Sequence, residues 1–417
     1  MTQAASHAFI ISQGEELLTG QTLDTNCNYL ANELSSLGLS VRGAITAGDR
    51  LDAIKGAFLL AEREADAVIC TGGLGPTLDD LTAQAAIAAF GGELVLDSEA
   101  LTQIRERYAN RGRPMAACNE KQAWLPKGST LLPNPLGTAP GFMIQTESGC
   151  RVYCLPGVPH EMRRMWLEEV RGSLRSGLTI IPPNRHLFCT MGSGESQLQE
   201  SLGSIPEEFP DVVLGFRARV PGVQVKLEAP PGCESFDAAI AVVRERLGAD
   251  LFSEDEAVSL AGRVGALLVQ RGEQLALAES CTGGWIGHLC VTEAGSSRWF
   301  ERGAISYSNE AKVAMLGVRS ATIEQNGAVS AEVATEMAEG AARAAGVAWG
   351  LAVTGIAGPG GGSPEKPVGT VHVAVSGPSG ERSRKLFLPT GSRTITRQYS
   401  AHIALDMLRR QLIRLGS

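Results

Sequence analysis

Short apolar runs alternate with segments of helical periodicity along the first part of the chain. The predicted strands and helices, in chain order, are Ala8–Ser12, Asn26–Leu37, Val41–Ile45, Leu51–Arg63 and Ala67–Cys70. This alternation of strand and helix is typical of a parallel sheet covered by helices. We therefore predict an α/β domain over residues 1–171, with its ligands beyond the carboxyl ends of the strands.

A different order of elements follows a proline-containing linker at Gly177–Asn184. The predicted strands and helices are His186–Met191, Glu195–Leu202, Val212–Val220, Gly222–Leu227 and Phe236–Leu247, with a hairpin turn at Pro221. Two consecutive strands joined by a tight turn indicate antiparallel pairing. This order predicts a small α+β module over residues 172–252.

The last part of the chain returns to the α/β pattern. Its predicted elements are the helix Ala257–Arg271, the buried strands Gln274–Ala278 and Trp349–Val353, a hairpin of Thr370–Ser376 with Glu381–Leu388, and an amphipathic helix at Arg393–Arg414. We predict a third domain, also α/β, over residues 253–417.

Composition narrows the classes of partner and compartment. The 417 residues carry a net charge of −8, and no dense run of Lys or Arg offsets it, so we expect no nucleic-acid partner. No stretch has the apolar length of a membrane span or the form of a signal peptide. The nine cysteines show no zinc-ligand spacing. We expect a cytoplasmic chain with reduced thiols and no membrane partner.

The sharpest chemical signal is the segment Ala278–Gly284, which lies between a predicted strand and a predicted helix. A hydroxyl at such a turn is held at the sheet edge, and the following amides and the helix N-terminus could stabilise an oxyanion. Ser280 is therefore a candidate nucleophile. Alternatively, Ser280 or Thr282 caps the helix. Cys281 is a rival nucleophile that has no evident histidine partner.

A serine nucleophile needs a base, and the segment Tyr307–Lys312 offers one. The histidine candidates in this domain, His288 and His372, lie in no motif with a carboxylate partner, so a Ser–His–Asp triad is poorly supported. Lys312 can serve if burial or a neighbouring cation lowers its pKa. The alternative is an ordinary surface lysine on a helix.

Two further elements suit an anionic substrate. Thr354–Gly362 is a glycine-rich loop that leaves a strand, and its exposed amides could bind a phosphate. It lacks the Gly-Lys-Ser/Thr of a Walker A loop, and an unstructured loop is the alternative. Arg393 and Arg397 lie one helical turn apart, where they could clamp a phosphate or a carboxylate.

These motifs, in this order, resemble those of the CinA C-terminal family, the nicotinamide mononucleotide amidohydrolases. The resemblance includes Gly369–Val371 and the helix with both arginines. It implies that Ser280 is the nucleophile, Lys312 the general base and Tyr307 a third catalytic residue, with no cofactor. The implied products are nicotinate mononucleotide and ammonia. The implied substrate contacts are Cys281, Thr282, Gly283, Asn309, Thr354, Gly355, Ala357, Gly358 and Arg397.

The first domain has its own signature at Thr71–Asp80, directly after a buried strand. Its glycines could let the backbone approach a pyrophosphate. Asp79 and Asp80 could hold a hydrated divalent cation against that phosphate. The alternative is that these aspartates cap the helix that begins at Leu81.

This domain resembles the molybdopterin-binding fold in its CinA N-terminal version. The resemblance rests on Gly14–Asn26, Thr71–Asp80, Asn134–Gly141 and Leu155–Met162, while Gln13 stands where a small residue is expected. It implies a pyrophosphatase acting on ADP-ribose with cobalt or magnesium, and potassium as a candidate further ion. The implied site is Gly72, Gly73, Gly75, Asp79, Asp80, Asn134 and Gly137, and the candidate metal ligands are Asp24, Asp49, Asp79 and Asp80. The rival interpretation is a domain that only binds a molybdopterin-like ligand.

The middle module resembles a KH-like fold. Its Gly192–Glu195 turn carries an acid where RNA-binding KH loops carry basic neighbours, so we expect no RNA binding. Breakdown of a dinucleotide cofactor yields both nicotinamide mononucleotide and ADP-ribose, so the first and third domains fit one salvage role. We also expect a homodimer. The alternative for the whole chain is a non-catalytic competence or DNA-damage accessory protein, which no basic stripe supports.

Overall fold

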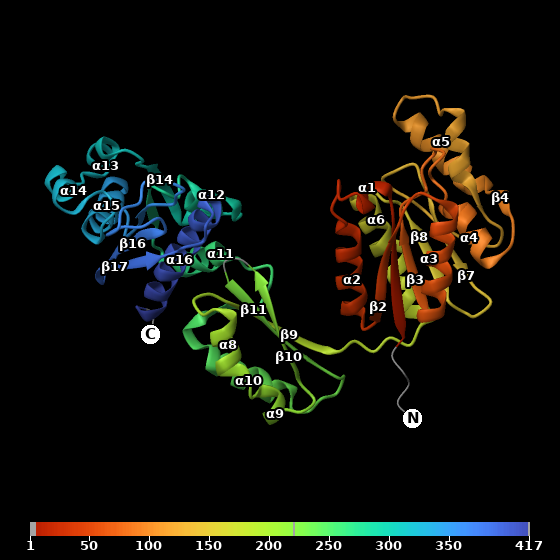
Figure 1. Cartoon of the computed structure of the whole chain (residues 1–417), viewed down its shortest axis with the longest axis horizontal. Coiled ribbons are helices and arrows are strands. Elements are labelled where there is room, and N and C mark those ends of the chain that lie inside the picture. The colour runs from red at the N-terminus through yellow and green to blue at the C-terminus, as the bar shows by residue number, and fades with distance from the viewer. Residues whose placement is uncertain (1–5, 220–221, 416–417) are drawn as a thin grey trace. The chain divides into compact units, whose positions relative to one another are not determined.

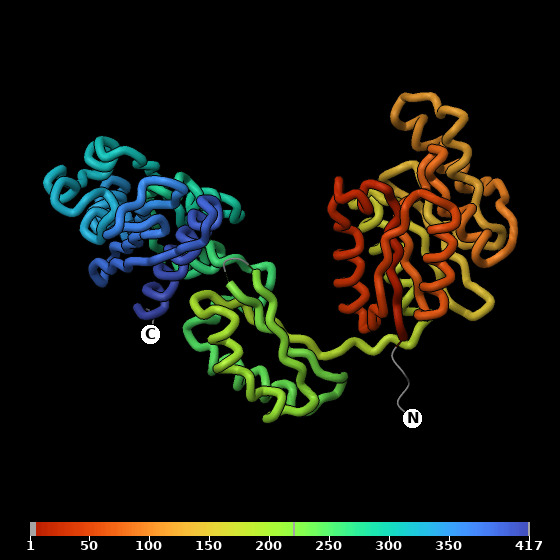
Figure 2. The backbone as a smooth tube through the Cα atoms, viewed as in Figure 1, coloured from red at the N-terminus to blue at the C-terminus, as the bar shows by residue number. Residues whose placement is uncertain are grey.

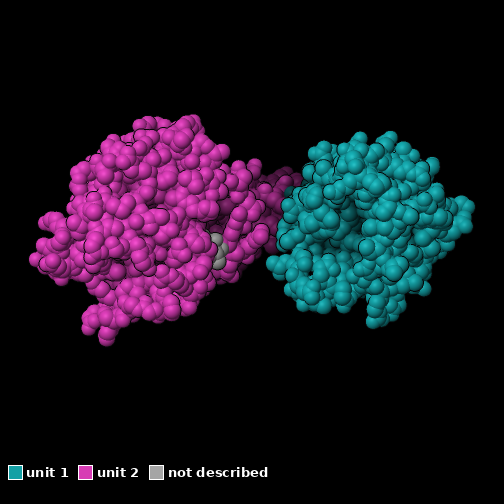
Figure 3. Space-filling model, turned by 90° about the horizontal axis from the view of Figure 1, so that it is seen from above, with its two compact units in different colours: residues 1–183 teal, residues 184–417 magenta. Residues whose placement is uncertain are grey.

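The computed structural model describes residues 6–219 and 222–415. The chain divides into two compact units, residues 1–183 and residues 184–417 (Figure 3). Both units interleave helices and strands, and each unit has a sheet that contains parallel strand pairs. The predicted α/β class is confirmed. Among the described residues, no helix combines the length and the apolar character needed to cross a membrane.

The first unit is built on a mixed six-stranded sheet in the order β2-β1-β3-β8-β7-β6. Its strands are β1 (His7–Gln13), β2 (Ser40–Ala47), β3 (Ala67–Thr71), β6 (Thr130–Leu132), β7 (Gly141–Gln145) and β8 (Arg151–Leu155). Strands β2, β1, β3 and β8 pair in parallel, so their carboxyl ends share one edge. The loops that carry the predicted phosphate and metal residues therefore gather at that edge.

Helices cover both faces of this sheet (Figure 1). The helices of this unit are α1 (Glu15–Leu18), α2 (Thr25–Leu37), α3 (Leu51–Glu64), α4 (Thr82–Phe90), α5 (Ser98–Asn110), α6 (Pro159–Met165) and α7 (Arg171–Gly177). Successive strand residues point to opposite faces, so Ile10 packs with α2 while Ile11 packs with α3. A short pair, β4 (Leu94–Leu96) with β5 (Trp124–Pro126), flanks α5 in the chain.

The predicted domain boundary after residue 171 falls inside a helical segment. Helix α7 buries Leu174 in the same apolar cluster as Trp166 and Leu30. This packing makes α7 part of the first unit, which continues to residue 183.

The second unit begins with the predicted α+β module. Its strands are β9 (Asn184–Thr190), β10 (Val213–Arg219), β11 (Gly222–Ala229) and β12 (Leu251–Ser253), and its helices are α8 (Glu195–Leu202), α9 (Ile205–Glu208) and α10 (Phe236–Leu247). They form an antiparallel sheet in the order β10-β11-β9-β12. The hairpin turn predicted at Pro221 lies outside the described residues.

The rest of the second unit contains a five-stranded sheet in the order β14-β13-β15-β16-β17. The strands are β13 (Leu275–Glu279), β14 (Phe300–Ile305), β15 (Trp349–Gly355), β16 (Thr370–Gly377) and β17 (Gly380–Phe387). The helices are α11 (Leu260–Arg271), α12 (Trp285–Thr292), α13 (Asn309–Leu316), α14 (Ser320–Asn326), α15 (Ala331–Ala345) and α16 (Arg393–Arg414). The bounds of α16 agree with the predicted amphipathic helix.

The two faces of this sheet have different residues. Leu275 and Leu277 face α11 and α16, whereas Ala276 and Ala278 belong to the cluster that packs on α15. The small side chains let α15 lie close to the sheet, and the backbone around Gly350 leaves no room for a Cβ against Ala338.

The module and the last sheet form one unit because α16 joins them. Arg409, which is buried, donates to the carbonyls of Ala249 and Leu251 and pairs with Asp406 at 2.7 Å. Met191, directly after β9, belongs to the apolar core of the last sheet. Two predicted domains are therefore one compact body, which the backbone trace in Figure 2 follows from yellow-green to blue.

Candidate functional site

The candidate nucleophile lies directly beyond a central strand of the last sheet. Strand β13 ends at Glu279, and the amide of Ser280 donates to the Val353 carbonyl of β15 at 3.0 Å. The chain then turns through Gly283 and Gly284, whose φ values of 60° and 89° favour glycine. Ser280 is buried and lies at the edge where the parallel strands β13, β14 and β15 end, which is the edge at which α/β sheets bind their ligands.

Glu279 is a site residue that we did not predict. Its carboxylate is buried and accepts hydrogen bonds from the amides of Gly284 (3.0 Å), Ile286 (3.1 Å) and Gly287 (2.8 Å). The first amides of α12 are thereby occupied, which corrects our expectation that this helix end faces the oxyanion. No side chain of the turn caps α12, so capping by Ser280 or Thr282 is also wrong. The available signal was an acid at the end of a strand, on a short turn that leads into a helix N-terminus.

Lys312 reaches the nucleophile from α13. Ser308 caps this helix by accepting from the Ala311 amide at 3.0 Å, which fixes the first turn. The Lys312 Nζ lies 3.1 Å from Ser280 Oγ, 2.9 Å from the Ser306 carbonyl and 3.2 Å from the Tyr307 carbonyl. Only 1% of the side chain's surface is exposed, so the alternative of a surface lysine is wrong.

The surroundings of Lys312 favour its neutral form. Burial lowers the pKa of Lys312 from its ordinary value, because the charged ammonium loses its hydration. A neutral amine can place its two N–H groups on the Ser306 and Tyr307 carbonyls. Its lone pair then faces the Ser280 hydroxyl, which is the arrangement that a general base needs. Among the described residues, no histidine contacts Ser280.

The surroundings of Cys281, the rival nucleophile, keep its thiol protonated. Burial raises the pKa of the Cys281 thiol to about 12. A thiol that stays protonated is a poor nucleophile. Cys281 also packs closely against Gly355, where a Cβ would lie 3.1 Å from its sulfur, so it is a packing residue of the turn.

The two arginines of α16 hold the loops around the nucleophile. Arg397 donates twice to the Thr282 carbonyl, at 3.2 and 2.7 Å, and lies over the Trp285 ring. Arg393 donates to the Gly358 carbonyl at 2.7 Å and to the Tyr307 hydroxyl at 3.2 Å. The glycine-rich loop, the tyrosine and the nucleophile turn are thus tied to one helix.

The remaining predicted substrate contacts differ in how deeply they are buried. Thr354 is buried and donates to the Ala328 carbonyl at 2.9 Å, and Ala357 is buried in the core beside the loop. Asn309 is exposed at the start of α13 and has no hydrogen bond to Ser280 or Lys312 within the part of the chain that the structure describes.

In the first unit, the glycines of the Thr71–Asp80 segment pack against Gln13. Gly72 and Gly73 have φ values of 104° and 65°, and a Cβ on Gly73 would overlap the Gln13 amide. The buried Gln13 side chain donates to Asp49 at 3.1 Å and accepts from the Thr82 hydroxyl. The residue that departs from the family pattern therefore occupies the space beside the second glycine.

The four candidate metal ligands do not converge on one point. Asp24 caps α2 through the Cys27 amide, and Asp49 accepts from Gln13 and from the Glu15 amide. The described residues contain no group of three or more His, Cys, Asp or Glu that could hold a metal ion. Of the four candidates, Asp79 and Asp80 fit a divalent cation, since magnesium often binds one or two carboxylates together with substrate phosphates.

Asp79 and Asp80 share one partner. Both carboxylates accept from the Thr77 hydroxyl, and Asp80 also accepts from the Thr77 amide at 2.8 Å. The hydrogen bond from Thr77 is the main reason that the pKa of Asp79 is lowered. Neither aspartate caps α4, so that alternative is wrong.

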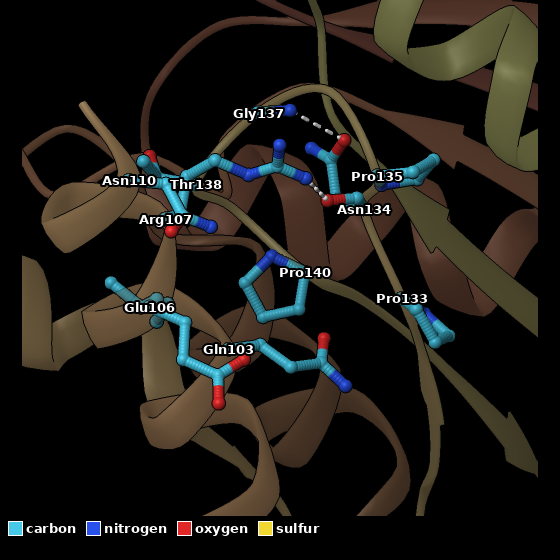
Figure 4. Close-up of a pocket in the computed structure, with 11 residues that line it drawn as sticks. Gln103, Glu106, Arg107, Asn110, Pro133, Asn134, Pro135, Gly137, Thr138 and Pro140 are labelled. Carbon is cyan, nitrogen blue, oxygen red and sulfur yellow. Dashed lines mark hydrogen bonds between the residues drawn. The ribbon is translucent and has the colours of Figure 1, made fainter.

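Five of the seven predicted site residues of the first unit line two cavities. Gly73, Gly75 and Asp80 line one of about 240 Å³. Asn134 and Gly137 line another of about 280 Å³, between α5 and the 133–140 loop (Figure 4). The Asn134 side chain accepts from the Gly137 amide at 2.8 Å, and Arg107 donates to the Asn134 carbonyl at 3.0 Å. Asn134 therefore shapes its own loop.

Comparison with known proteins gives the family. Residues 257–412 match the family described as the CinA C-terminal domain, and residues 9–176 match the probable molybdopterin binding domain. The CinA-like protein of Citrifermentans bemidjiense is 44% identical over 412 residues, with 97% of each chain covered. That of Synechococcus elongatus is 42% identical over 416 residues, with 98% of each covered. The chain belongs to the CinA family.

Solved structures of CinA proteins align with part of this CinA-family chain. The competence/damage inducible protein CihA from Agrobacterium tumefaciens is 42% identical, covers 38% of this chain and 94% of its own, and has a TM-score of 0.36. The protein CinA with unknown function from Thermoplasma acidophilum is 36% identical, covers 40% and 98%, and has a TM-score of 0.38.

Proposed function

We propose that the C-terminal part of this CinA-family protein hydrolyses the carboxamide of nicotinamide mononucleotide to nicotinate mononucleotide and ammonia. The observation that carries the proposal is the contact of 3.1 Å between Lys312 Nζ and Ser280 Oγ, with the amine buried. A serine beside a lysine of lowered pKa is a nucleophile with its base.

The first half of the reaction forms an ester. Ser280 Oγ attacks the carboxamide carbon while its proton passes to the neutral Lys312 Nζ. The carbonyl oxygen becomes an oxyanion beside the nucleophile turn, where the Thr282 amide has no hydrogen-bond partner within the described structure. The C–N bond then breaks, and the Lys312 ammonium gives its proton to the leaving nitrogen, which departs as ammonia.

The second half releases the acid. Water attacks the ester carbon, and Lys312 accepts its proton. As the bond to Ser280 breaks, the same proton returns to Ser280 Oγ, which restores the starting state. One amine thus serves as base and acid in both halves, as nucleophilic catalysis requires.

The substrate assignment rests on family membership and on the hydrogen-bond donors of α16 and of the glycine-rich loop. Arg393 and Arg397 keep N–H groups beyond those they donate to Gly358, Tyr307 and Thr282. Guanidinium groups and glycine-loop amides are the donors that a mononucleotide phosphate needs.

The test is ammonia release from nicotinamide mononucleotide by the full chain, with nicotinate mononucleotide identified as the second product. Nicotinamide, which lacks the ribose phosphate, serves as the control substrate. Absence of ammonia with folded protein would overturn the proposal and favour a non-catalytic accessory role.

Cys281→Ala should retain deamidation within about threefold of the native rate, since a protonated, packed thiol contributes no nucleophile. Initial rates of ammonia release check this expectation. A loss of about a thousandfold or more, with an unchanged melting temperature, would assign the nucleophile to Cys281 instead.

We propose ADP-ribose hydrolysis for the first unit, with the Asp79–Asp80 pair as the protein's part of a divalent-cation site. Cobalt or magnesium would supply charge neutralisation of the pyrophosphate, and potassium is a candidate further ion. The support is the cavity of about 240 Å³ lined by Gly73, Gly75 and Asp80. Binding of a molybdopterin-like ligand without hydrolysis is the second candidate.

Metal-dependent release of AMP from ADP-ribose distinguishes these candidates. We expect release with magnesium or cobalt, none with a chelator, and a loss of about a hundredfold in Asp80→Asn. Arg50→Ala, which changes an exposed residue paired with Asp52, is the control. Tight binding of a pterin with no AMP release would contradict the hydrolase.

We also propose that the protein works in the cytoplasm as a homodimer. All nine cysteines are free thiols, in keeping with a reducing compartment.

A further inference from the structure

Ser280 and Ser306 directly follow two adjacent strands of the C-terminal sheet. In the strand register, Glu279 pairs with Ile305 of β14 and with Val353 of β15. The Ser306 amide donates to the Glu279 carbonyl at 2.9 Å, which continues the β13–β14 ladder one residue further. Ser306 therefore stands across from Ser280.

Ser306 and Ser280 share a face of the sheet. Residues in register on adjacent strands project to the same side, and every second residue along a strand repeats that side. Ala278, two residues before Ser280, packs on the α15 side, and Ala304, two residues before Ser306, packs against the same cluster. Lys312, on α13, also approaches from this side.

The Ser306 hydroxyl has no partner in this position. Its Oγ is buried, none of the side-chain surface is exposed, and no hydrogen bond satisfies it within the described structure. Buried hydroxyls without partners are rare, and each needs an explanation, such as a catalytic role or another group that binds there. The Ser306 carbonyl meanwhile holds Lys312 Nζ at 2.9 Å. Ser306 thus touches the base with its backbone and keeps its side chain free.

We infer that the Ser306 hydroxyl accepts an N–H of the substrate carboxamide and so positions the leaving nitrogen; this rests on the proposed amidase function. An amide nitrogen brings two N–H groups, and a buried site must supply acceptors for them. On the Ser306 side, the departing nitrogen lies next to the Lys312 ammonium that protonates it. Ser306 itself neither gains nor loses a proton in the reaction.

The test compares an amide with an ester in Ser306→Ala. Nicotinamide mononucleotide has N–H groups on the leaving atom, whereas the methyl ester of nicotinate mononucleotide has none. We expect kcat/KM for the amide to fall by about ten- to a hundredfold, the range for one lost hydrogen bond to a buried group. Ester hydrolysis should stay within about twofold, because the nucleophile and its base are unchanged.

Ser12→Ala is the matched control, since Ser12 is another buried serine, in the first unit, whose hydroxyl has no partner among the described residues. It should leave both C-terminal rates unchanged. Removal of a hydroxyl without a partner should not unfold the chain, which the melting temperature checks. An equal fall for amide and ester, or an unchanged rate for both, would overturn the inference alone. Absence of amide turnover in the native chain would overturn the proposed function itself.

Discussion

Ser280→Ala should abolish ammonia release from nicotinamide mononucleotide, with a loss of about 10⁴- to 10⁶-fold in kcat. The variant removes the atom that attacks the carboxamide carbon in the first half of the proposed reaction. Lys312 and the turn after Ser280 remain, so substrate binding should change little. The hydroxyl contacts Lys312 Nζ and has no other hydrogen bond within the described structure, so the fold should persist.

The measurement is ammonia production under saturating substrate, together with mass spectrometry of the native chain quenched during turnover. A native acyl-ester on Ser280 should appear there and be absent from the variant. Ser320→Ala, an exposed serine of the same domain, controls for the substitution itself. Retained ammonia release in Ser280→Ala would show that another group attacks the carboxamide.

The neighbourhood of Ser280 could be predicted because of how parallel sheets are built. Glu279 and Ile305 end adjacent parallel strands, so the residues that follow both strands must meet at one edge. The motifs at Ala278–Gly284 and Tyr307–Lys312 therefore come together although about thirty residues separate Ser280 from Lys312. Periodicity also predicted the bounds of α16, since its apolar stripe is long and begins at a serine cap.

The roles of Glu279 and Ser306 could not be predicted in the same way. An acid before a helix is usually a solvated residue, and only the structure shows that Glu279 accepts from three amides. Ser306 directly follows an ordinary strand, and its significance depends on the partner that its buried hydroxyl lacks within the described structure. Hydrogen bonding across strands depends on register, which local spacing does not determine.

In the first unit, the sequence predicted metal ligands whose carboxylates make other contacts in the structure. Asp24 and Asp49 look like ligands in the sequence because they lie in loops at the ligand edge. In the structure, a helix N-terminus and the Gln13 amide already take up these carboxylates. Aspartate is favoured equally by caps, turns and metal sites, so its position in a loop does not decide between them.

The pH dependence of deamidation should follow the protonation of Lys312. Burial lowers its pKa below the ordinary 10.5, and only the neutral amine can accept the proton of Ser280. Below that pKa the amine is charged, so kcat/KM should rise with pH by about tenfold per pH unit. Above it, the rate should level off. The rising part of the pH profile therefore lies at lower pH than it would for a lysine with the ordinary pKa.

Lys312→Arg separates the charge from the base. Arginine keeps the positive charge and can donate to the Ser306 and Tyr307 carbonyls, but it does not deprotonate at accessible pH. We expect a loss of about a thousandfold or more, and no recovery between about pH 6 and about pH 10. Lys312→Met should be equally inactive while removing the charge. If the arginine variant kept substantial activity, Lys312 would be only an electrostatic anchor, and the proton of Ser280 would have to leave by way of water.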